Sequence, residues 1–166
     1  WMGDLRSAIE LLSERQDVGG VWLAGSSAGG ALAICVAADD PRVRGVVTLA
    51  APASFADWAA SPARLLEYSR EIGMIRHAGF PADPVAWGKH FTEVSPLECA
   101  ARLGPRPLLL IHGDQDEVVP LSDSRALYEA AYESADLRVV AGGGHRLRHD
   151  PRAVALLIGW LARQSP

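Results

Sequence analysis

The sequence is poor in the residues and runs that mark several classes of protein. It has two cysteines, and Cys35 and Cys99 are far apart and belong to no C-x-x-C motif or His/Cys cluster. We therefore expect buried free thiols rather than a disulfide framework or a zinc site. No apolar run approaches the roughly 18 residues of a membrane span, and no charged-then-apolar signal peptide opens the chain. These absences predict a protein without a membrane segment and with a cytoplasmic location.

Positive charge is also scarce. The 16 Lys and Arg residues are outnumbered by 20 Asp and Glu residues, which gives a formal net charge of -4. Such a chain lacks the excess of positive charge that binds phosphate backbones, so we expect no nucleic-acid partner. With 49% hydrophobic and 22% charged residues over 166 positions, the composition is that of one ordinary globular domain.

One stretch organises the rest of the chain. Gly25-Ser26-Ser27-Ala28-Gly29 follows a short apolar run, precedes a helix-forming segment and fits G-x-S-x-G. A serine on a strained turn needs glycines on either side, where a Cβ would collide with neighbouring backbone. The helix predicted over 28–38 aims its N-terminal amides at the same spot, where developing negative charge is stabilised. Ser27 is the candidate nucleophile.

Other interpretations of this stretch remain open at this point. A turn of small residues that lets a helix pack close to a strand would look the same. A phosphate-binding loop is disfavoured because no Gly-Lys-Ser/Thr follows, and the dinucleotide fingerprint fails because its central glycine would fall on Ser27.

Helical and extended patterns alternate along the chain. Leu5, Ile9 and Leu12 recur at helical spacing, and Gly19-Gly20 ends that opening helix. Strands separated by helices imply a parallel sheet, and hence the α/β class. Between them lies a looser region, which we expect to form a small helical cap insertion at about 53–104. The predicted strands cover 21–24, 43–50, 107–111 and 137–141, and the later helices cover 122–134 and 151–164.

Two loops follow the later strands, at the sheet edge where open α/β sheets carry their chemistry. The first runs from His112 to Pro120 and contains several carboxylates; the second is Gly142-Gly143-Gly144-His145. Its three glycines give the backbone freedom to place an imidazole over the sheet edge. A serine becomes a good nucleophile when a histidine takes its proton and a carboxylate orients that histidine.

With these residues the sequence resembles the α/β-hydrolase superfamily, and more narrowly its dienelactone-hydrolase-like and prolyl-oligopeptidase-like esterases and peptidases. The resemblance covers nearly the whole chain and implies a triad of Ser27, Asp116 and His145, in the family's order. By the family's pattern the acid lies two residues before Val118, and the amide of Ala28 is one oxyanion donor. The implied protein is a serine hydrolase for a small ester or peptide-like substrate, without metal or organic cofactor.

Several residues compete for these roles. Asp114 lies in the same loop, but an aspartate right after a glycine more often closes the turn by bonding its own backbone. His149 is the rival base, placed at the mouth of the last helix, which Asp150 is expected to cap with Pro151 in its first turn. His112 ends a buried strand and is expected to be structural. Trp58, Trp87 and Phe91 either line an acyl pocket or pack the cap.

The family's sheet has more strands than this chain supplies. The four predicted strands correspond to the last four, so the resemblance predicts a partial fold whose N-terminal half is missing. That half would carry the second oxyanion donor and flank the first strand. If the chain is complete as it stands, pairing of that strand with a second copy predicts a homo-oligomer. The alternative to an enzyme is a relative that keeps the triad residues but only binds a ligand or partner.

Overall fold

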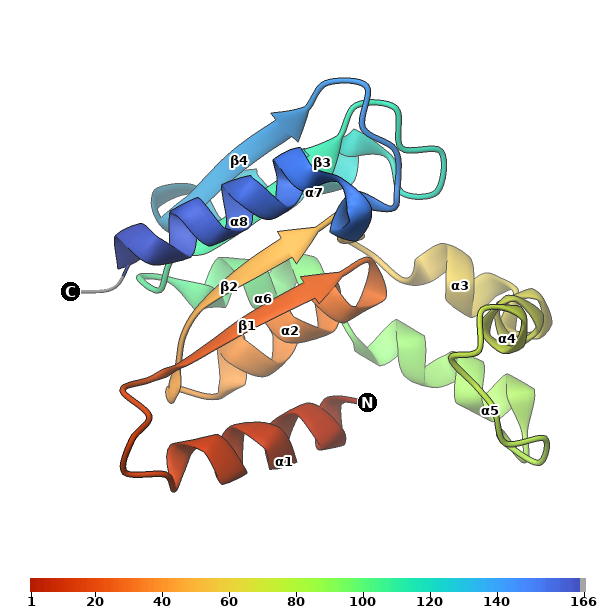
Figure 1. Cartoon of the computed structure of the whole chain (residues 1–166). Coiled ribbons are helices and arrows are strands. Elements are labelled where there is room, and N and C mark those ends of the chain that lie inside the picture. The colour runs from red at the N-terminus through yellow and green to blue at the C-terminus, as the bar shows by residue number, and fades with distance from the viewer. Residues whose placement is uncertain (165–166) are drawn as a thin grey trace. The chain divides into compact units, whose positions relative to one another are not determined.

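Four parallel strands form one sheet in the order β1-β2-β3-β4 (Figure 1). The computed structural model describes residues 1–164. Each strand pairs with the next strand of the chain in parallel register, as the alternation of strands and helices predicts. The strands are β1 (Val21–Ser26), β2 (Val43–Leu49), β3 (Leu108–Gly113) and β4 (Ala135–Val140).

The two central strands are buried on both faces. All residues of β3 are buried, and in β2 only Arg44 is exposed. Their composition explains this, because Leu, Ile and Val suit a sheet that helices cover on both sides. The edge strands β1 and β4 keep more exposed positions. The parallel arrangement brings the carboxyl ends of all four strands to one edge of the sheet.

Helices cover both faces of this sheet (Figure 1). On one face, Trp160 of the last helix meets Trp22 of β1 edge to face, with ring centroids 5.7 Å apart. Val47, Leu49, Leu109 and other buried side chains complete that core. The helices of the sheet unit are α1 (Met2–Ser13), α2 (Ala28–Asp39), α6 (Pro96–Leu103), α7 (Leu121–Ala131) and α8 (Pro151–Gln164), with short 3-10 turns η2 (Tyr132–Ser134) and η3 (Leu147–His149).

The opposite face carries α2, which is buried along most of its length. Its nine buried residues include Ile34, Cys35 and Val36, so this helix is apolar all round and serves as a core element. Arg106 closes the carboxyl end of α2 by donating to the carbonyls of Ala37 and Asp40. Cys35 and Cys99 are buried and free, as predicted.

The middle of the chain forms a second compact unit, Ser54–Ser95. Inside this helical unit the aromatic rings of Phe55, Trp58, Trp87 and Phe91 pack against one another, with ring centroids 5.1 to 6.2 Å apart. Of the two roles expected for Trp58, Trp87 and Phe91, acyl pocket or packing, these contacts within the unit are those of packing. Its elements are α3 (Ala56–Ala60), α4 (Pro62–Glu71), α5 (Pro84–Lys89) and η1 (His90–Glu93).

This helical unit is shorter than the insertion expected at about 53–104. The difference is α6, which belongs to the unit that contains the sheet. Its Cys99, Ala100 and Leu103 are buried, and α6 packs against α2 and α7. The apolar stripe of α6 therefore belongs to the core of the sheet unit, and sequence periodicity alone does not say which core a short helix joins.

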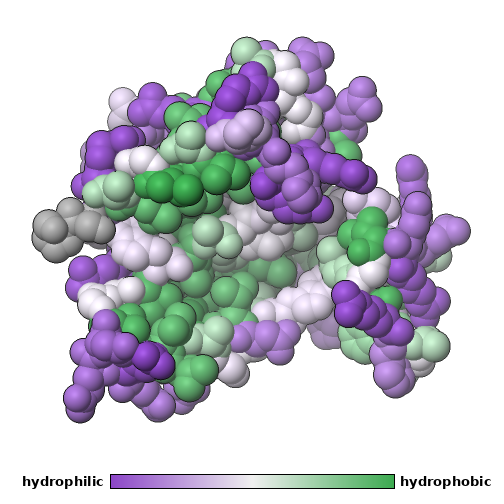
Figure 2. Space-filling model, viewed as in Figure 1, coloured by the Kyte–Doolittle hydropathy of each residue, from purple (hydrophilic) through white to green (hydrophobic). Residues whose placement is uncertain are grey.

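Apolar side chains gather on one side of the sheet unit, between α1 and α8 (Figure 2). Exposed large side chains of these two helices include Leu11 and Leu12 of α1 and Ile158 of α8, with 67%, 41% and 59% of their surface accessible. Within residues 1–164, β1 has a pairing partner on one side only. No helix in that range combines the length and the apolar character needed to cross a membrane.

Candidate active site

Ser27 occupies the turn between β1 and α2. Its backbone has φ 54° and ψ −130°, a conformation that a residue with a Cβ rarely adopts. The turn is held from two sides: the Ser27 amide donates to the Leu49 carbonyl at 2.8 Å, and the Ser27 carbonyl accepts from the Gly30 amide at 2.9 Å. Strain of this kind persists where the surrounding structure fixes the chain. The turn sits at the carboxyl end of β1.

The glycines around Ser27 have different reasons to be glycine. A Cβ on Gly25 would overlap the backbone of Gly29 and Gly30, and a Cβ on Gly30 would lie 2.9 Å from the Gly25 carbonyl oxygen. At Gly29 no atom of another described residue that would crowd a side chain lies within 4 Å of the Cβ position. The expected crowding on both sides of Ser27 is therefore correct for Gly25 and wrong for Gly29. The second crowded glycine is Gly30, in the first turn of α2, where a Cβ would approach the backbone of β1.

The amide of Ala28 is placed as an N-terminal helix amide. Ala28 is the first residue of α2, so its N–H is among the first four, which have no acceptor within the helix. The helix dipole adds positive potential at this end. Ser27 and the Ala28 amide thus share the tip of the same turn.

Asp116 and His145 are brought together by the loops that follow β3 and β4. His145 Nδ1 lies 2.9 Å from Asp116 Oδ2 and 3.2 Å from Asp116 Oδ1. The Asp116 side chain is fully buried, whereas 14% of the His145 side chain is accessible. A carboxylate that accepts from Nδ1 fixes the tautomer in which Nε2 is free to accept a proton.

Backbone amides hold the Asp116 carboxylate in place. Its Oδ1 accepts from the amides of Val118 and Val119, each at 2.9 Å. Burial opposes ionisation of this carboxyl group, but the two amides and His145 outweigh it, and the pKa of Asp116 lies below its ordinary value. Asp116 is therefore a carboxylate at neutral pH, the form that an imidazole partner requires.

The two loops are joined backbone to backbone. The Gln115 amide donates to the Gly143 carbonyl at 2.9 Å, and a Cβ on Gly113 would overlap that same peptide group. Asp114 adds a link, because its Oδ1 accepts from the Gly142 amide at 2.7 Å. The expectation that Asp114 bonds the backbone of its own turn is wrong in detail, since its carboxylate reaches the neighbouring loop.

The two other histidines near this edge of the sheet have environments that differ from that of His145. His149 is exposed in η3, directly before the Asp150 cap of α8, whose Oδ1 accepts from the Arg152 amide at 2.9 Å. His112 is fully buried in β3 and hydrogen-bonded through both ring nitrogens. The structural role of His112 was predicted, but its proximity to Asp116 was not. The sequence signal for that proximity was a single polar side chain in an otherwise apolar strand.

The order of the strands determines where Ser27 lies relative to Asp116 and His145. It follows β1, whereas Asp116 and His145 follow β3 and β4, and β2 lies between. Within residues 1–164 no hydrogen bond is formed by Ser27 Oγ. The structure therefore joins Asp116 to His145 directly and places Ser27 at the same edge of the sheet without a hydrogen bond to His145.

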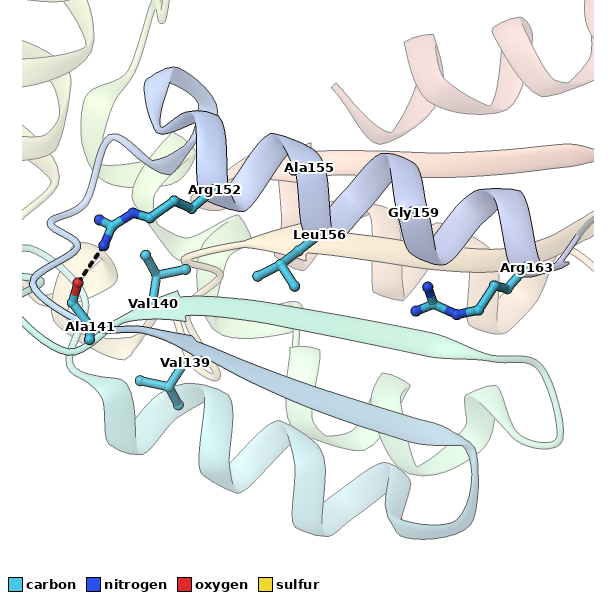
Figure 3. A pocket seen from close by; sticks show the side chains of 8 residues that line it. All are labelled: Val139, Val140, Ala141, Arg152, Ala155, Leu156, Gly159 and Arg163. Carbon is cyan, nitrogen blue, oxygen red and sulfur yellow. Dashed lines mark hydrogen bonds between the residues drawn. The ribbon is translucent and has the colours of Figure 1, made fainter.

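A separate pocket of about 450 Å³ lies between β4 and α8 (Figure 3). Val139, Val140 and Leu156 give it an apolar lining, and Arg152 and Arg163 stand at its rim. The Arg152 guanidinium donates to the Ala141 carbonyl at 2.8 Å and pairs with Asp150. None of the three candidate triad residues lines this pocket, so it carries no part of the candidate chemistry.

Comparison with protein families identifies the chain's relatives. The model of the prolyl oligopeptidase family matches residues 3–165. The chain belongs to the prolyl oligopeptidase family. Within curated sequences, 148 residues are 32% identical to the uncharacterized protein YfhR of Escherichia coli O157:H7 and 31% identical to YfhR of Escherichia coli strain K12. Each alignment covers 87% of this chain and 45% of the relative, so the chain spans about half the length of these proteins.

Solved structures share the fold of this prolyl oligopeptidase family member. The esterase domain of a Rhodothermus marinus protein superposes with a TM-score of 0.70 at 24% identity, over 98% of this chain and 68% of that one. Est1E from Butyrivibrio proteoclasticus gives a TM-score of 0.71 at 18% identity, over 96% and 66%. These likenesses establish an α/β-hydrolase fold with a four-stranded parallel sheet.

Proposed function

We propose that this chain is a serine hydrolase that cleaves an ester or peptide-like acyl bond through an acyl-enzyme. Ser27 Oγ attacks the acyl carbon while His145 Nε2 takes the hydroxyl proton, and Asp116 stabilises the imidazolium. His145 then gives that proton to the leaving group. Water hydrolyses the acyl-enzyme by the same steps and restores the Ser27 hydroxyl.

The observation that carries this proposal is the bond of 2.9 Å between His145 Nδ1 and Asp116 Oδ2. It leaves Nε2 as the proton acceptor, at the sheet edge where Ser27 holds its strained turn. The Ala28 amide is one donor to the oxyanion of the tetrahedral intermediate, since it is free of intrahelical bonding. The substrate is a small molecule with an acyl carbonyl, and these steps use neither a metal nor an organic cofactor.

A different function is a binding protein that keeps these residues without turnover. The absence of a Ser27 Oγ hydrogen bond within residues 1–164 favours it, because an unactivated serine is a poor nucleophile. The two functions differ in one property that is simple to measure. A hydrolase has a serine that reacts with an acyl-like electrophile, and a binding protein does not.

A fluorophosphonate probe followed by peptide mass mapping tests the proposal. We expect the phosphonyl group on Ser27, and none in Ser27→Ala. Ser26→Ala is the matched control, because within residues 1–164 the buried Ser26 Oγ has no hydrogen-bond partner, so its loss removes no contact of that kind. Hydrolysis of p-nitrophenyl acetate should follow the same pattern. Equal labelling of wild type and Ser27→Ala, or no labelling of folded wild type, would overturn the proposal.

A further inference from the structure

His112 is a fully buried imidazole in a strand that is otherwise apolar. It precedes the last residue of β3, with Leu110 and Ile111 before it and Gly113 after it. A polar group in such a place costs free energy unless its hydrogen bonds are made. The side chain that meets it from α7 is Ser124, which is itself fully buried.

The partners of His112 fix which nitrogen carries a proton. Nε2 lies 2.9 Å from the carbonyl oxygen of Val119, and a carbonyl only accepts, so Nε2 carries a hydrogen. Nδ1 lies 2.6 Å from Ser124 Oγ, whose hydroxyl can donate to it. Ser124 and the Val119 carbonyl thus favour the same tautomer of a neutral ring, with Nε2–H turned toward the loop that contains Asp116.

The same nitrogen also lies near the candidate acid. His112 Nε2 lies 3.4 Å from Asp116 Oδ2, the same oxygen that lies 2.9 Å from His145 Nδ1. The Asp116 carboxylate therefore lies between two imidazole rings: His145 is hydrogen-bonded to it, and His112 Nε2, whose hydrogen is directed to Val119, lies 3.4 Å from it. Its other oxygen is occupied by the amides of Val118 and Val119.

We propose that His112, oriented by Ser124, is a positioning residue that holds Asp116 for His145. The inference rests on the proposed function for its catalytic meaning, but the contact itself is a property of the folded chain. The His112 ring restricts rotation of the Asp116 carboxylate, and its N–H dipole stabilises the negative charge. Loss of this donor leaves more of the charge to interact with protonated His145, so that the His145 ring keeps its proton to a higher pH.

The remaining charged groups around this pair come from three places. In the loop after β3, Asp114 accepts from the Gly142 amide and Glu117 is exposed. On α7, Asp123 Oδ2 accepts from the Ala53 amide at 2.9 Å. Beyond β4, Arg146 and Arg148 are exposed and Arg152 pairs with Asp150. The buried ring that approaches the Asp116 carboxylate from inside the unit is His112.

The test is a proton NMR titration of the His145 ring, whose signal is identified among the 5 histidines by its loss in His145→Ala. His112→Leu removes the donor, whereas His112→Gln retains an N–H in its place. We expect the midpoint of the His145 titration to rise by about 0.5 pH unit in His112→Leu and to stay near wild type in His112→Gln. Ser124→Ala should raise it in the same direction by a smaller amount.

Ser69→Ala is the matched control, because it also truncates a fully buried helical serine, one whose Oγ has no hydrogen-bond partner in the part of the chain that the structure describes. It should leave the midpoint unchanged. A purely structural role for His112 would lower thermal stability in His112→Leu without moving the midpoint, and that result overturns the proposal. If His112→Leu does not fold, an unmoved midpoint in Ser124→Ala overturns it equally.

The readout separates this inference from the proposed function. If wild type neither hydrolyses p-nitrophenyl acetate nor is labelled on Ser27, the hydrolase proposal fails while the titration still reports on the His112 contact. If wild type is active and the His112→Leu midpoint rises, kcat in the acidic pH range should fall more than at neutral pH, with KM little changed. An active enzyme with an unmoved midpoint contradicts the positioning role alone.

Discussion

The backbone of Gly113 lies so close to that of Gly143 that a Cβ on Gly113 would overlap the Gly143 carbonyl group. Gly113 ends β3, and Gly143 lies in the loop after β4, so this contact joins the Asp116 loop to the His145 loop. The Gln115 amide reinforces it by donating to the Gly143 carbonyl. The distance between Asp116 and His145 is set by this backbone contact as well as by their own hydrogen bond.

Gly113→Ala should therefore destabilise the protein and weaken the Asp116–His145 pair. The overlap is with backbone, which cannot rotate away as a side chain does, so we expect a loss of about 1–3 kcal/mol in the free energy of unfolding. Urea denaturation measures this loss. Gly144→Ala is the control, because the nearest contact of its added Cβ among residues 1–164 would be the Gln115 carbonyl oxygen, at a relaxed 3.9 Å. Equal stability of the two variants would show that the loops are not in close contact.

The two aspartates of the first loop should separate stability from activity. Asp114→Ala removes the acceptor of the Gly142 amide and should cost about 1 kcal/mol of folding free energy, with a small effect on turnover. Asp116→Asn keeps the shape of the side chain but disturbs the His145 tautomer, so turnover should fall by about 10,000-fold. Urea denaturation and esterase rates measure the two effects. A larger loss of turnover in Asp114→Ala would assign the acid to Asp114.

The sheet was predictable because its strands are apolar runs between recognisable breaks. The central strands were found within one or two residues: 43–50 was expected where β2 is Val43–Leu49, and 107–111 where β3 is Leu108–Gly113. β4 was expected over 137–141 and begins earlier, at Ala135, because pairing with β3 extends it through residues of mixed polarity. The parallel direction of the strands followed from the helices between them, whereas their order in the sheet was not predicted.

The site was predictable as far as its motifs are local. G-x-S-x-G placed Ser27 on a strained turn, and the two later loops supplied Asp116 and His145, which the fold brings into contact. Contacts made by residues outside these motifs could not be predicted from the sequence. That Gly30 rather than Gly29 is crowded, and that His112 and Ser124 lie behind Asp116, depends on how α2 and α7 pack on the sheet.

Substitution of the two histidines of the last loop region should distinguish their roles. His149 is exposed in η3, and its side chain has no hydrogen bond to a carboxylate of residues 1–164. His149→Ala should therefore keep ester hydrolysis and fluorophosphonate labelling near the wild-type level. His145→Ala should lose both, because Ser27 then lacks a proton acceptor. The reverse pattern would assign the base to His149 and require a different acid.

The acid sensitivity of the fold should report on the Asp116 carboxylate. Its pKa is lower in the folded protein than the value of about 3.9 expected when unfolded, so its contribution to stability is present above about pH 4. That contribution is lost as the pH falls through the lower folded value. Asp116→Asn lacks it at every pH. The difference in unfolding free energy between wild type and Asp116→Asn should therefore be present at about pH 5 and shrink toward about pH 2.

Urea denaturation of both proteins across this range makes the measurement. Arg152 holds the pKa of Asp150 at about 2 and Arg42 lowers the pKa of Asp40, but both pairs are common to the two proteins and cancel in the difference. Ser69→Ala changes no ionisable group, so its difference from wild type should not vary with pH. A difference for Asp116→Asn that stays constant or widens toward pH 2 would mean that the amides of Val118 and Val119 and the His145 ring do not favour the charged carboxylate.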